Sequence, residues 1–318
     1  MSKQALSRRP GVTGVHSIDH FGLVVPDLEV ARSFYDQFGL AVHVEPRRLV
    51  LHTRGNSHRW GVVSPGPAKR LSYLSFGIFE DDELALQRKL EKRDVKSAAA
   101  PPGAEPGGWW IEGFDGLPIN IRIADKSSPN EKSVFAAAST APGVSGALTH
   151  AKAPKVHPRR LSHVAIFTTS ITEAIAFYES ALGLRLSDRS GEGVAFLHGV
   201  HGSDHHMLAL VKSDHRGLHH LSWDVGSVQE VGLGAAQAAR GGFEAGWGLG
   251  RHVLGANYFH YVRDPWGSYC EYSADIDYVP ADCDWPAGDH APEDAMFLWG
   301  PPPPADFATN YEPSEVAR

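Results

Sequence analysis

Histidines and one carboxylate interrupt apolar runs in the second half of the chain. His163 lies in one run, His219 and His220 stand side by side in a second, and Glu271 lies in a third. An imidazole or a carboxylate inside a strand costs free energy unless it has a partner. Two imidazoles and one carboxylate share that cost if they bind one metal ion, and such a set leaves coordination positions open, as in non-haem Fe(II) oxygenases. These residues therefore predict a metal site that also accepts a substrate and O₂.

The elements that carry these residues occur twice in the chain. Residues 18–40 and 161–184 each read as a short apolar strand followed by a helix with one apolar face. Gly39 and Gly183 follow these helices, where a C-terminal capping glycine belongs. The apolar runs 71–76 and 218–223 also correspond. The repeat predicts two modules, each built from a strand, a helix and three further strands.

The two copies differ at the positions that could bind a metal. Where the second copy has His163, the pair 219–220 and Glu271, the first copy has His20, the pair Ser72-Tyr73 and an apolar run around Ile121. The first copy thus has the same strands without the polar trio, so the fold does not require it. We therefore expect the metal site in the second copy alone.

Composition divides the rest of the chain. Residues 134–158 are rich in Ala, Ser, Gly and Pro, as connectors are. Residues 280–318 are rich in proline but also contain several large aromatic side chains, which predicts an ordered arm laid over the body. The predicted organisation is an N-terminal tail at 1–15, a module without metal at 16–130, a connector at 131–158, a metal-binding module at 159–279 and a C-terminal arm at 280–318.

Charge and cysteine content narrow the classes of partner. The formal net charge is −7 and no basic stripe is visible, which argues against nucleic acid as a partner. No apolar run approaches the roughly 18 residues of a membrane span. The two cysteines cannot form a disulfide framework for 318 residues, and no secretory signal precedes the first module. We expect a cytoplasmic protein that acts on a small molecule.

The segment 250–271 resembles the signature of the type I extradiol ring-cleavage dioxygenases, which belong to the vicinal oxygen chelate superfamily. The match includes His252, Tyr261, Asp264 and Glu271; His260 departs from it, because the family prefers an apolar residue there. The runs 161–163 and 218–222 resemble the strands that carry the family's other two metal ligands. The resemblance covers about residues 16–278 and so includes both modules.

This resemblance implies an α+β fold of two tandem modules like those of glyoxalase and bleomycin-resistance proteins. Each is made of paired βαβββ units, with the catalytic metal site in the curved sheet of the C-terminal module. The implied metal ligands are His163, His220 and Glu271, and the implied cofactor is Fe(II), although Mn(II) suits the same ligands. Relatives are homo-oligomers, so a tetramer or octamer is expected.

The resemblance also implies the residues that act on the substrate. The run 204–210 resembles the strand that carries the family's acid–base histidine. Aligning its apolar end places that histidine at His206, whereas counting back from His220 favours His205. His252 and Tyr261 match the pair that contacts the substrate and hydrogen-bonds its metal-bound oxygen.

Two further residues near these positions are candidates, Trp247 for substrate binding and Asp264 for a supporting role. Trp247 precedes His252 and should border the substrate pocket. Asp264 either supports the site through its turn or is an ordinary turn carboxylate before Pro265.

The implied reaction is extradiol, or meta, cleavage of a catechol in the catabolism of aromatic compounds. Both atoms of O₂ enter the product, a ring-opened acid of the muconic semialdehyde type. By analogy the substrate is a monocyclic catechol with an alkyl or carboxyl group, such as dihydroxycumate or trihydroxytoluene. The alternatives are a glyoxalase-type isomerase, a metal-free small-molecule binding protein and a purely structural role. Metal-dependent O₂ uptake separates the enzyme from the last two.

Overall fold

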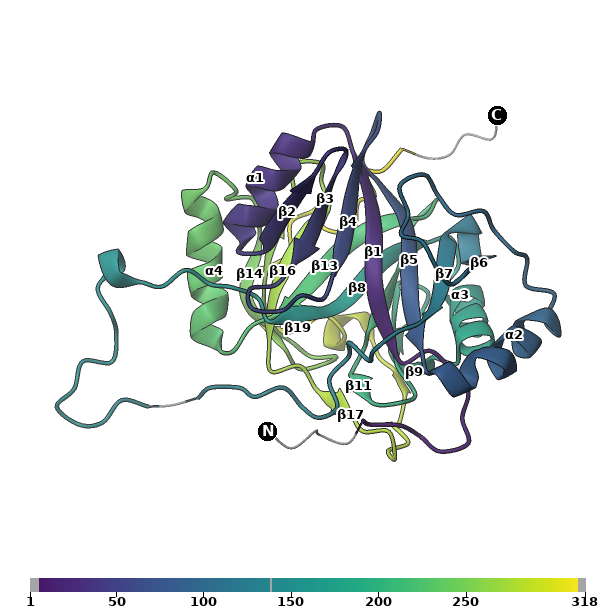
Figure 1. Ribbon diagram of the computed structural model, residues 1–318. Helices are drawn as coiled ribbons and strands as arrows, with labels where there is room; N and C mark the ends of the chain where they lie inside the picture. Colours follow the sequence, from purple (N-terminus) through teal and green to yellow (C-terminus); the bar gives the residue numbers. More distant parts are fainter. Residues whose placement is uncertain (1–5, 138, 314–318) are drawn as a thin grey trace.

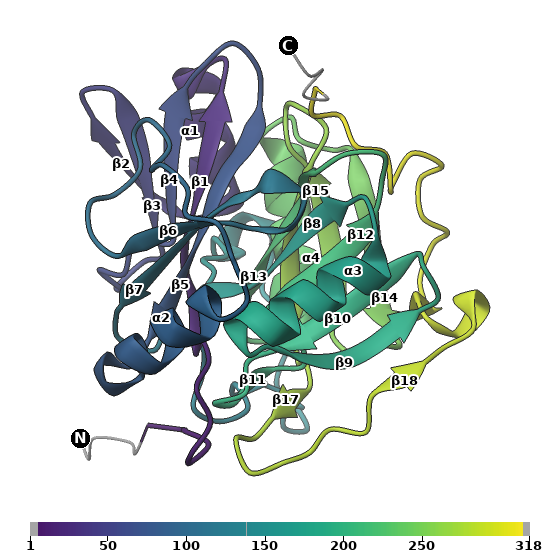
Figure 2. The ribbon, with the colours of Figure 1, turned by 90° about the vertical axis from the view of Figure 1, so that its right-hand side faces the viewer.

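Two mixed sheets lie side by side and make up most of the molecule (Figures 1 and 2). The computed structural model describes residues 6–137 and 139–313. Residues 1–5 of the predicted tail, residue 138 of the connector and residues 314–318 of the arm lie outside the described residues. No helix in the described ranges is long and apolar enough to cross a membrane.

The first sheet contains the N-terminal strands in the order β2-β3-β4-β1-β5-β7-β6. Helices α1 and α2 belong to this module. Its elements are β1 (Ser17–Val25), α1 (Leu28–Phe38), β2 (Ala41–Glu45), β3 (Arg48–His52), β4 (Gly61–Pro65), β5 (Arg70–Ile78), η1 (Glu80–Asp82), α2 (Glu83–Glu91), β6 (Trp109–Glu112), η2 (Phe114–Gly116) and β7 (Pro118–Ile123).

The second sheet has the order β18-β9-β10-β12-β8-β13-β16-β15-β14-β19, and β11 pairs with β17 beside it. Its outermost strands, β18 and β19, come from the C-terminal arm. The elements are η3 (His150–Lys152), β8 (Arg160–Thr168), α3 (Ile171–Phe177), η4 (Tyr178–Leu182), β9 (Arg185–Ser190), β10 (Val194–His198), β11 (Ser203–Asp204), β12 (Leu208–Lys212), β13 (Gly217–Asp224), α4 (Val228–Arg240), β14 (Gly246–His252), β15 (Tyr258–Arg263), β16 (Tyr269–Ala274), β17 (Tyr278–Val279), β18 (Gly288–Asp289), η5 (Pro292–Asp294) and β19 (Phe297–Trp299).

The two sheets share one wiring pattern. In the first, β1 is parallel to β4 and antiparallel to β5, and β5 is parallel to β7. In the second, β8 is parallel to β12 and antiparallel to β13, and β13 is parallel to β16. The predicted duplication and the α+β class are therefore confirmed.

The helical segments of the repeat end where the sequence predicted. The side chain of Asp27 accepts hydrogen bonds from the first turn of α1, which ends at Gly39 with φ of 104°. The corresponding helical segment of the second module ends at Gly183 with φ of 77°. Both glycines adopt the left-handed conformation that other residues reach only at a cost, so both predicted caps are confirmed.

The two modules pack against each other through α1 and α4, which lie side by side in Figure 1. The Gln37 amide donates to the Gln237 carbonyl, and the Gln237 amide donates to the Gln37 carbonyl. The rings of Phe38 and Tyr272 stack at 4.0 Å between centroids. Buried apolar residues of both modules thus form one continuous core.

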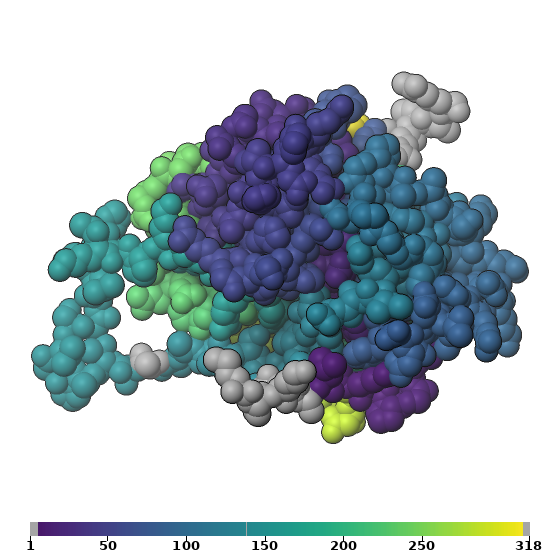
Figure 3. Space-filling model, in the orientation of Figure 1, coloured from purple at the N-terminus to yellow at the C-terminus, as the bar shows by residue number. Residues whose placement is uncertain are grey.

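The connector and the arm differ in how they lie on the body of the protein. Part of the connector stands away from the body as a long loop (Figures 1 and 3). The arm packs along the second sheet, because β18 pairs with β9 and β19 pairs with β14 (Figure 2). The far end of the arm reaches the boundary between the modules, where the buried carboxylate of Glu312 accepts hydrogen bonds from the backbone N–H groups of Leu71 and Leu218.

We expect Glu312→Ala to lower the free energy of unfolding by about 3–5 kcal/mol, because it leaves a buried cation without its partner. Glu312 lies 2.7 Å from the ammonium group of Lys69, and both side chains are almost fully buried. Urea denaturation followed by tryptophan fluorescence measures the loss. Glu293→Ala, at an exposed arm residue, is the matched control. Equal midpoints for the two variants would contradict the predicted role of Glu312.

Candidate metal centre and substrate pocket

Three adjacent strands bring two histidines and one glutamate together. β13 lies between β8 and β16, and its residue Ser222 pairs with His163 on one side and Glu271 on the other. His220 lies two residues from Ser222, so it emerges on the same face of the sheet. The Nε2 atoms of His163 and His220 are 3.0 Å apart. Glu271 Oε2 lies 3.3 Å from the first and 3.7 Å from the second.

The bonding of Glu271 fits a metal ligand. Its Oε1 accepts a hydrogen bond from the Asn257 amide at 3.0 Å, but its Oε2 is buried and has no hydrogen-bond partner among the described residues. Burial raises the pKa of Glu271, but His163 and, to a smaller extent, His252 and Ser222 together outweigh burial and bring the pKa below its ordinary value. The carboxylate is therefore charged, and a cation between Oε2 and the two imidazoles would satisfy it. Metal bonds of about 2.1 Å at right angles would separate neighbouring ligand atoms by about 3 Å, close to the distances found.

His219 lies behind His220. Their Nδ1 atoms are 2.7 Å apart, so a hydrogen bond between the two rings fixes how His220 presents its Nε2. Burial lowers the pKa of His219 to about 4, which keeps it neutral at working pH. Phe307 of the arm packs edge-on against the His219 ring at 4.8 Å.

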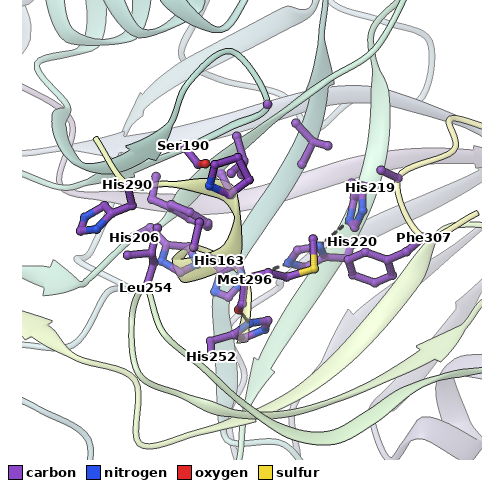
Figure 4. Close-up of a pocket in the computed structure, with 18 of the residues that line it drawn as sticks. His163, Ser190, His206, His219, His220, His252, Leu254, His290, Met296 and Phe307 are labelled. Atoms are coloured by element: carbon purple, nitrogen blue, oxygen red, sulfur yellow. Dashed lines mark hydrogen bonds between the residues drawn. The ribbon is translucent and has the colours of Figure 1, made fainter. Parts of the chain in front are cut away.

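The structure separates the two candidates for the acid–base histidine. His206 lines the pocket, and its ring centroid is 4.1 Å from that of His163. His205 points behind the pocket wall, where its Nε2 lies 2.8 Å from the carboxylate of Asp188. Figure 4 shows His206 beside His163 at the pocket surface. The alignment through the apolar run, rather than the count back from His220, thus identifies the histidine that faces the pocket.

His252 and Tyr261 lie beside the candidate ligands: His252 Nε2 is 3.8 Å from Glu271 Oε1, and the Tyr261 ring is 5.1 Å from the His220 ring. The His252 Nε2 and the Tyr261 hydroxyl are 3.0 Å apart. The His252 Nδ1 lies 2.6 Å from the Met296 carbonyl of the arm and must donate to it, which leaves Nε2 as an acceptor in the neutral ring. The Tyr261 hydroxyl can then donate to it. Burial and the nearby Glu271 raise the pKa of Tyr261 well above its ordinary value, so the phenol keeps its proton.

Trp247 and Asp264 have different surroundings. The indole of Trp247 lines the pocket, stacks on the Tyr261 ring at 5.5 Å and donates to the Pro301 carbonyl. Asp264 does not line the pocket. Its carboxylate accepts hydrogen bonds from the backbone N–H groups of Trp266 and Ser268 in the turn before β16. It therefore acts on the site only through the turn that precedes the strand carrying Glu271.

The three candidate ligands lie at the base of a cavity of about 620 Å³. The second sheet forms its floor and the arm covers it, as Figure 4 shows for Met296 and Phe307. Sequence reasoning did not find the arm residues or Asn257, because no spacing links them to the ligands. The residues lining the cavity all come from the second module and the arm: His163, Ser190, Gly191, Glu192, Gly193, Val194, Phe196, His206, Ala209, Val211, His219, His220, Trp247, His252, Leu254, Asn257, Tyr261, Glu271, Asp289, His290, Pro292, Ala295, Met296, Phe307 and Ala308.

The sequence predicted an apolar residue at the first-module position that corresponds to Glu271, and this prediction was wrong. In the second module Glu271 pairs with Ser222. In the first, the corresponding pair is Asn120 with Ser75, one residue away from Ile121. A shift of one residue moves a side chain to the other face of a sheet, so the polar Asn120 takes the equivalent position.

The polar groups of the first module satisfy one another. The Ser75 hydroxyl donates to the Asn120 amide oxygen at 2.9 Å. His20 Nε2 lies 3.1 Å from the Tyr73 hydroxyl, and its Nδ1 lies 2.6 Å from the carboxylate of Asp19. Within the described residues, a cluster of three potential metal ligands occurs only at His163, His220 and Glu271.

Comparison with known proteins identifies the family. Residues 160–272 match the model of the glyoxalase/bleomycin resistance protein/dioxygenase superfamily. The chain is 49% identical to metapyrocatechase 2 of Cupriavidus necator over 97% of this chain and 96% of that protein.

Solved structures share the fold. The Mn(II)-bound glyoxalase of Novosphingobium aromaticivorans is 25% identical, with a TM-score of 0.74 over 92% of this chain and 94% of that one. An extradiol ring-cleaving dioxygenase from B. fuscum is 18% identical, with a TM-score of 0.73 over 98% of this chain and 85% of that one. The 49% identity to a metapyrocatechase over nearly the full length and the shared fold lead to one conclusion: the chain belongs to the type I extradiol ring-cleavage dioxygenases of the vicinal oxygen chelate superfamily and is a catechol dioxygenase.

Proposed function

We propose that His163, His220 and Glu271 hold a divalent iron, with manganese as the other metal that suits them, and that the pocket above them binds the catechol. The observation that supports this most strongly is the unpartnered Glu271 Oε2, buried within 3.7 Å of two imidazole nitrogens. When bound, the metal supplies adjacent positions for both catechol oxygens and O₂ and lets electron density pass from the ring to O₂.

The protein's own groups position the substrate. The His252 and Tyr261 pair borders the cavity beside Glu271, so it can hydrogen-bond one catechol oxygen. With substrate bound, the single Tyr261 proton is donated to that oxygen instead of to His252 Nε2, and the freed Nε2 lone pair can accept from a catechol O–H. A buried pair of this kind holds the catechol in one orientation and stabilises the charge that develops on its oxygen.

His206 packs against His163, with 4.1 Å between the ring centroids, and serves as the acid–base group. Burial and the neighbouring histidines keep its pKa well below the ordinary value, so the ring is neutral when substrate arrives. A neutral imidazole can take the catechol proton and later return a proton to oxygen. The ring packs against Phe196 at 4.7 Å, which limits access of water to it.

An isotope experiment tests the reaction class. Iron-loaded protein given catechol under ¹⁸O₂ should form a ring-opened product that carries both labelled atoms, and cleavage should lie beside the two hydroxyls. An intradiol product, with cleavage between the hydroxyls, would contradict the proposal. Isomerisation of a thiohemiacetal without O₂ consumption would favour the glyoxalase-type alternative instead.

The lining of the pocket supports catechols with an uncharged, apolar substituent as the substrate class. Away from the ligands the wall consists mainly of small and apolar side chains, among them Val194, Ala209 and Val211. The lining residues, which all lie within the described ranges, include no lysine and no arginine. Besides the candidate ligand Glu271, the carboxylates among them are Glu192 and Asp289. Of the two substituents expected from the sequence, this lining favours alkyl over carboxyl.

We expect kcat/KM for a carboxyl-bearing catechol to be at least about 100-fold below that for an alkylcatechol of the same size, because a buried carboxylate without a partner is costly. 2,3-Dihydroxybenzoate and 3-ethylcatechol form a suitable pair, with unsubstituted catechol as the reference. Val211→Lys, which places a cation in the wall, should narrow the ratio. Equal values for the two substrates in the unmodified protein would contradict this substrate class.

A further inference from the structure

Asp188, on β9 behind the pocket wall, gathers hydrogen-bond donors from two distant segments. From the strand side, His205 Nε2 lies 2.8 Å from Oδ2. From the arm, the backbone N–H of Gly288 donates to Oδ1 at 2.9 Å and His290 Nε2 lies 2.7 Å from the same oxygen. The indole of Trp285 donates to Oδ2 at 3.3 Å. One buried carboxylate therefore joins the arm to the histidine next to His206.

The charge of Asp188 determines which way its hydrogen bonds run. Burial raises its pKa, but the hydrogen bonds from His205 and His290 outweigh burial and bring the pKa down to about 2. An ionised carboxylate only accepts hydrogen bonds, so His205 must carry a proton on Nε2.

The protonation of His205 also sets the direction of its hydrogen bond to His206. His205 Nδ1 and His206 Nδ1 are 3.0 Å apart, so one of them donates to the other. The neutral form of His205 carries a single ring proton, and the contact with Asp188 holds that proton on Nε2. A neutral His205 with its proton on Nε2 has a lone pair on Nδ1. His206 must then donate from Nδ1, and its Nε2 is left as the acceptor.

We propose that Asp188 is a positioning residue, which acts through His205 to hold His206 in the tautomer that keeps a lone pair on Nε2. His206 can then take a proton from the substrate as soon as it binds. Donors from the arm bind the same carboxylate as His205. The position of the arm over the pocket and the orientation of His205 therefore both depend on Asp188. This inference rests on the acid–base role proposed for His206.

Neutron crystallography of the deuterium-exchanged protein tests the tautomers directly and needs no variant. The expected map has deuterium on His205 Nε2 and on His206 Nδ1, and none on His206 Nε2. Deuterium on His206 Nε2 in place of Nδ1 would overturn the proposal. The map is independent of turnover, so it separates a failure here from a failure of the proposed reaction.

Kinetics of Asp188→Ala test the consequence. Without the carboxylate the two rings can adopt other tautomers, so kcat should fall by about 10–100-fold, while KM for catechol and the iron content stay within about twofold. His205→Phe should give a similar loss. A change in KM alone would show that Asp188 merely anchors the arm.

The control removes a different arm contact. Asp306 accepts hydrogen bonds from the guanidinium of Arg263 at 2.6 and 2.7 Å and does not line the pocket. Asp306→Ala therefore loosens the arm without touching Asp188. We expect its kcat to stay within about twofold of the unmodified protein, since surface ion pairs contribute little. A loss equal to that of Asp188→Ala would overturn the proposed action through His205.

Discussion

Glu271→Gln removes bound iron and, with it, ring cleavage. Glu271 supplies the only negative charge among the three proposed ligands, and its Oε2 has no other partner in the structure. Glutamine keeps the shape and the contact with Asn257 but is a neutral, weaker ligand. We expect iron affinity to fall by more than the roughly 10–100-fold seen when a residue that merely supports a metal ligand is changed. Metal analysis after anaerobic loading and desalting measures the iron per chain.

The first module offers a matched control for this substitution. Tyr73 stands where His220 stands in the second module, and it hydrogen-bonds with His20 rather than facing a metal site. Tyr73→Phe should leave iron content and turnover unchanged. Stoichiometric iron in Glu271→Gln would remove this residue from the ligand set, and loss of iron in Tyr73→Phe would place a metal in the first module.

His206→Phe separates metal binding from proton transfer. Phenylalanine keeps a flat ring against Phe196 and His163, so the pocket wall and the iron content should remain intact. It cannot accept or return a proton. We expect kcat to fall by about 10²–10⁴-fold, the range typical of lost general acid–base catalysis. Steady-state O₂ consumption at saturating catechol, corrected for bound iron, provides the measurement.

A second histidine provides the comparison for this variant. His260 lies next to Tyr261 on β15, so its side chain points to the other face of the sheet, and it does not line the pocket. His260→Phe should therefore keep kcat within about twofold of the unmodified protein. Turnover of His206→Phe at the same level would exclude His206 from the mechanism.

Much of the site could be predicted because its determinants are local. A polar residue in an otherwise apolar strand is visible in the sequence, and the first module supplies a version of the same strands for comparison. His163 and Glu271 stood out in this way. The capping glycines Gly39 and Gly183 were equally visible, because a helix end requires a particular backbone conformation there.

The remainder depends on contacts between distant segments. The hydrogen bond between Met296 and His252 joins residues 44 positions apart, and the contact between Asp188 and His290 joins residues 102 positions apart. No spacing in the chain predicts either contact. The error at Ile121 has another cause. Neighbouring residues of a strand face opposite sides, and strand pairing rather than the apolar pattern shows that Asn120 faces the equivalent site. The expected tetramer or octamer and the cytoplasmic location stay predictions.

Oxygen uptake by the iron-loaded protein tests the extradiol reaction most directly. Protein loaded anaerobically with Fe(II) is mixed with aerated buffer and a limiting amount of 3-methylcatechol, while O₂ and visible absorbance are followed together. We predict consumption of one O₂ per catechol, a yellow ring-opened product, and neither signal in the metal-free protein. Protein that retains one iron per chain but consumes no O₂ with unsubstituted or alkyl-substituted catechols would contradict the assignment.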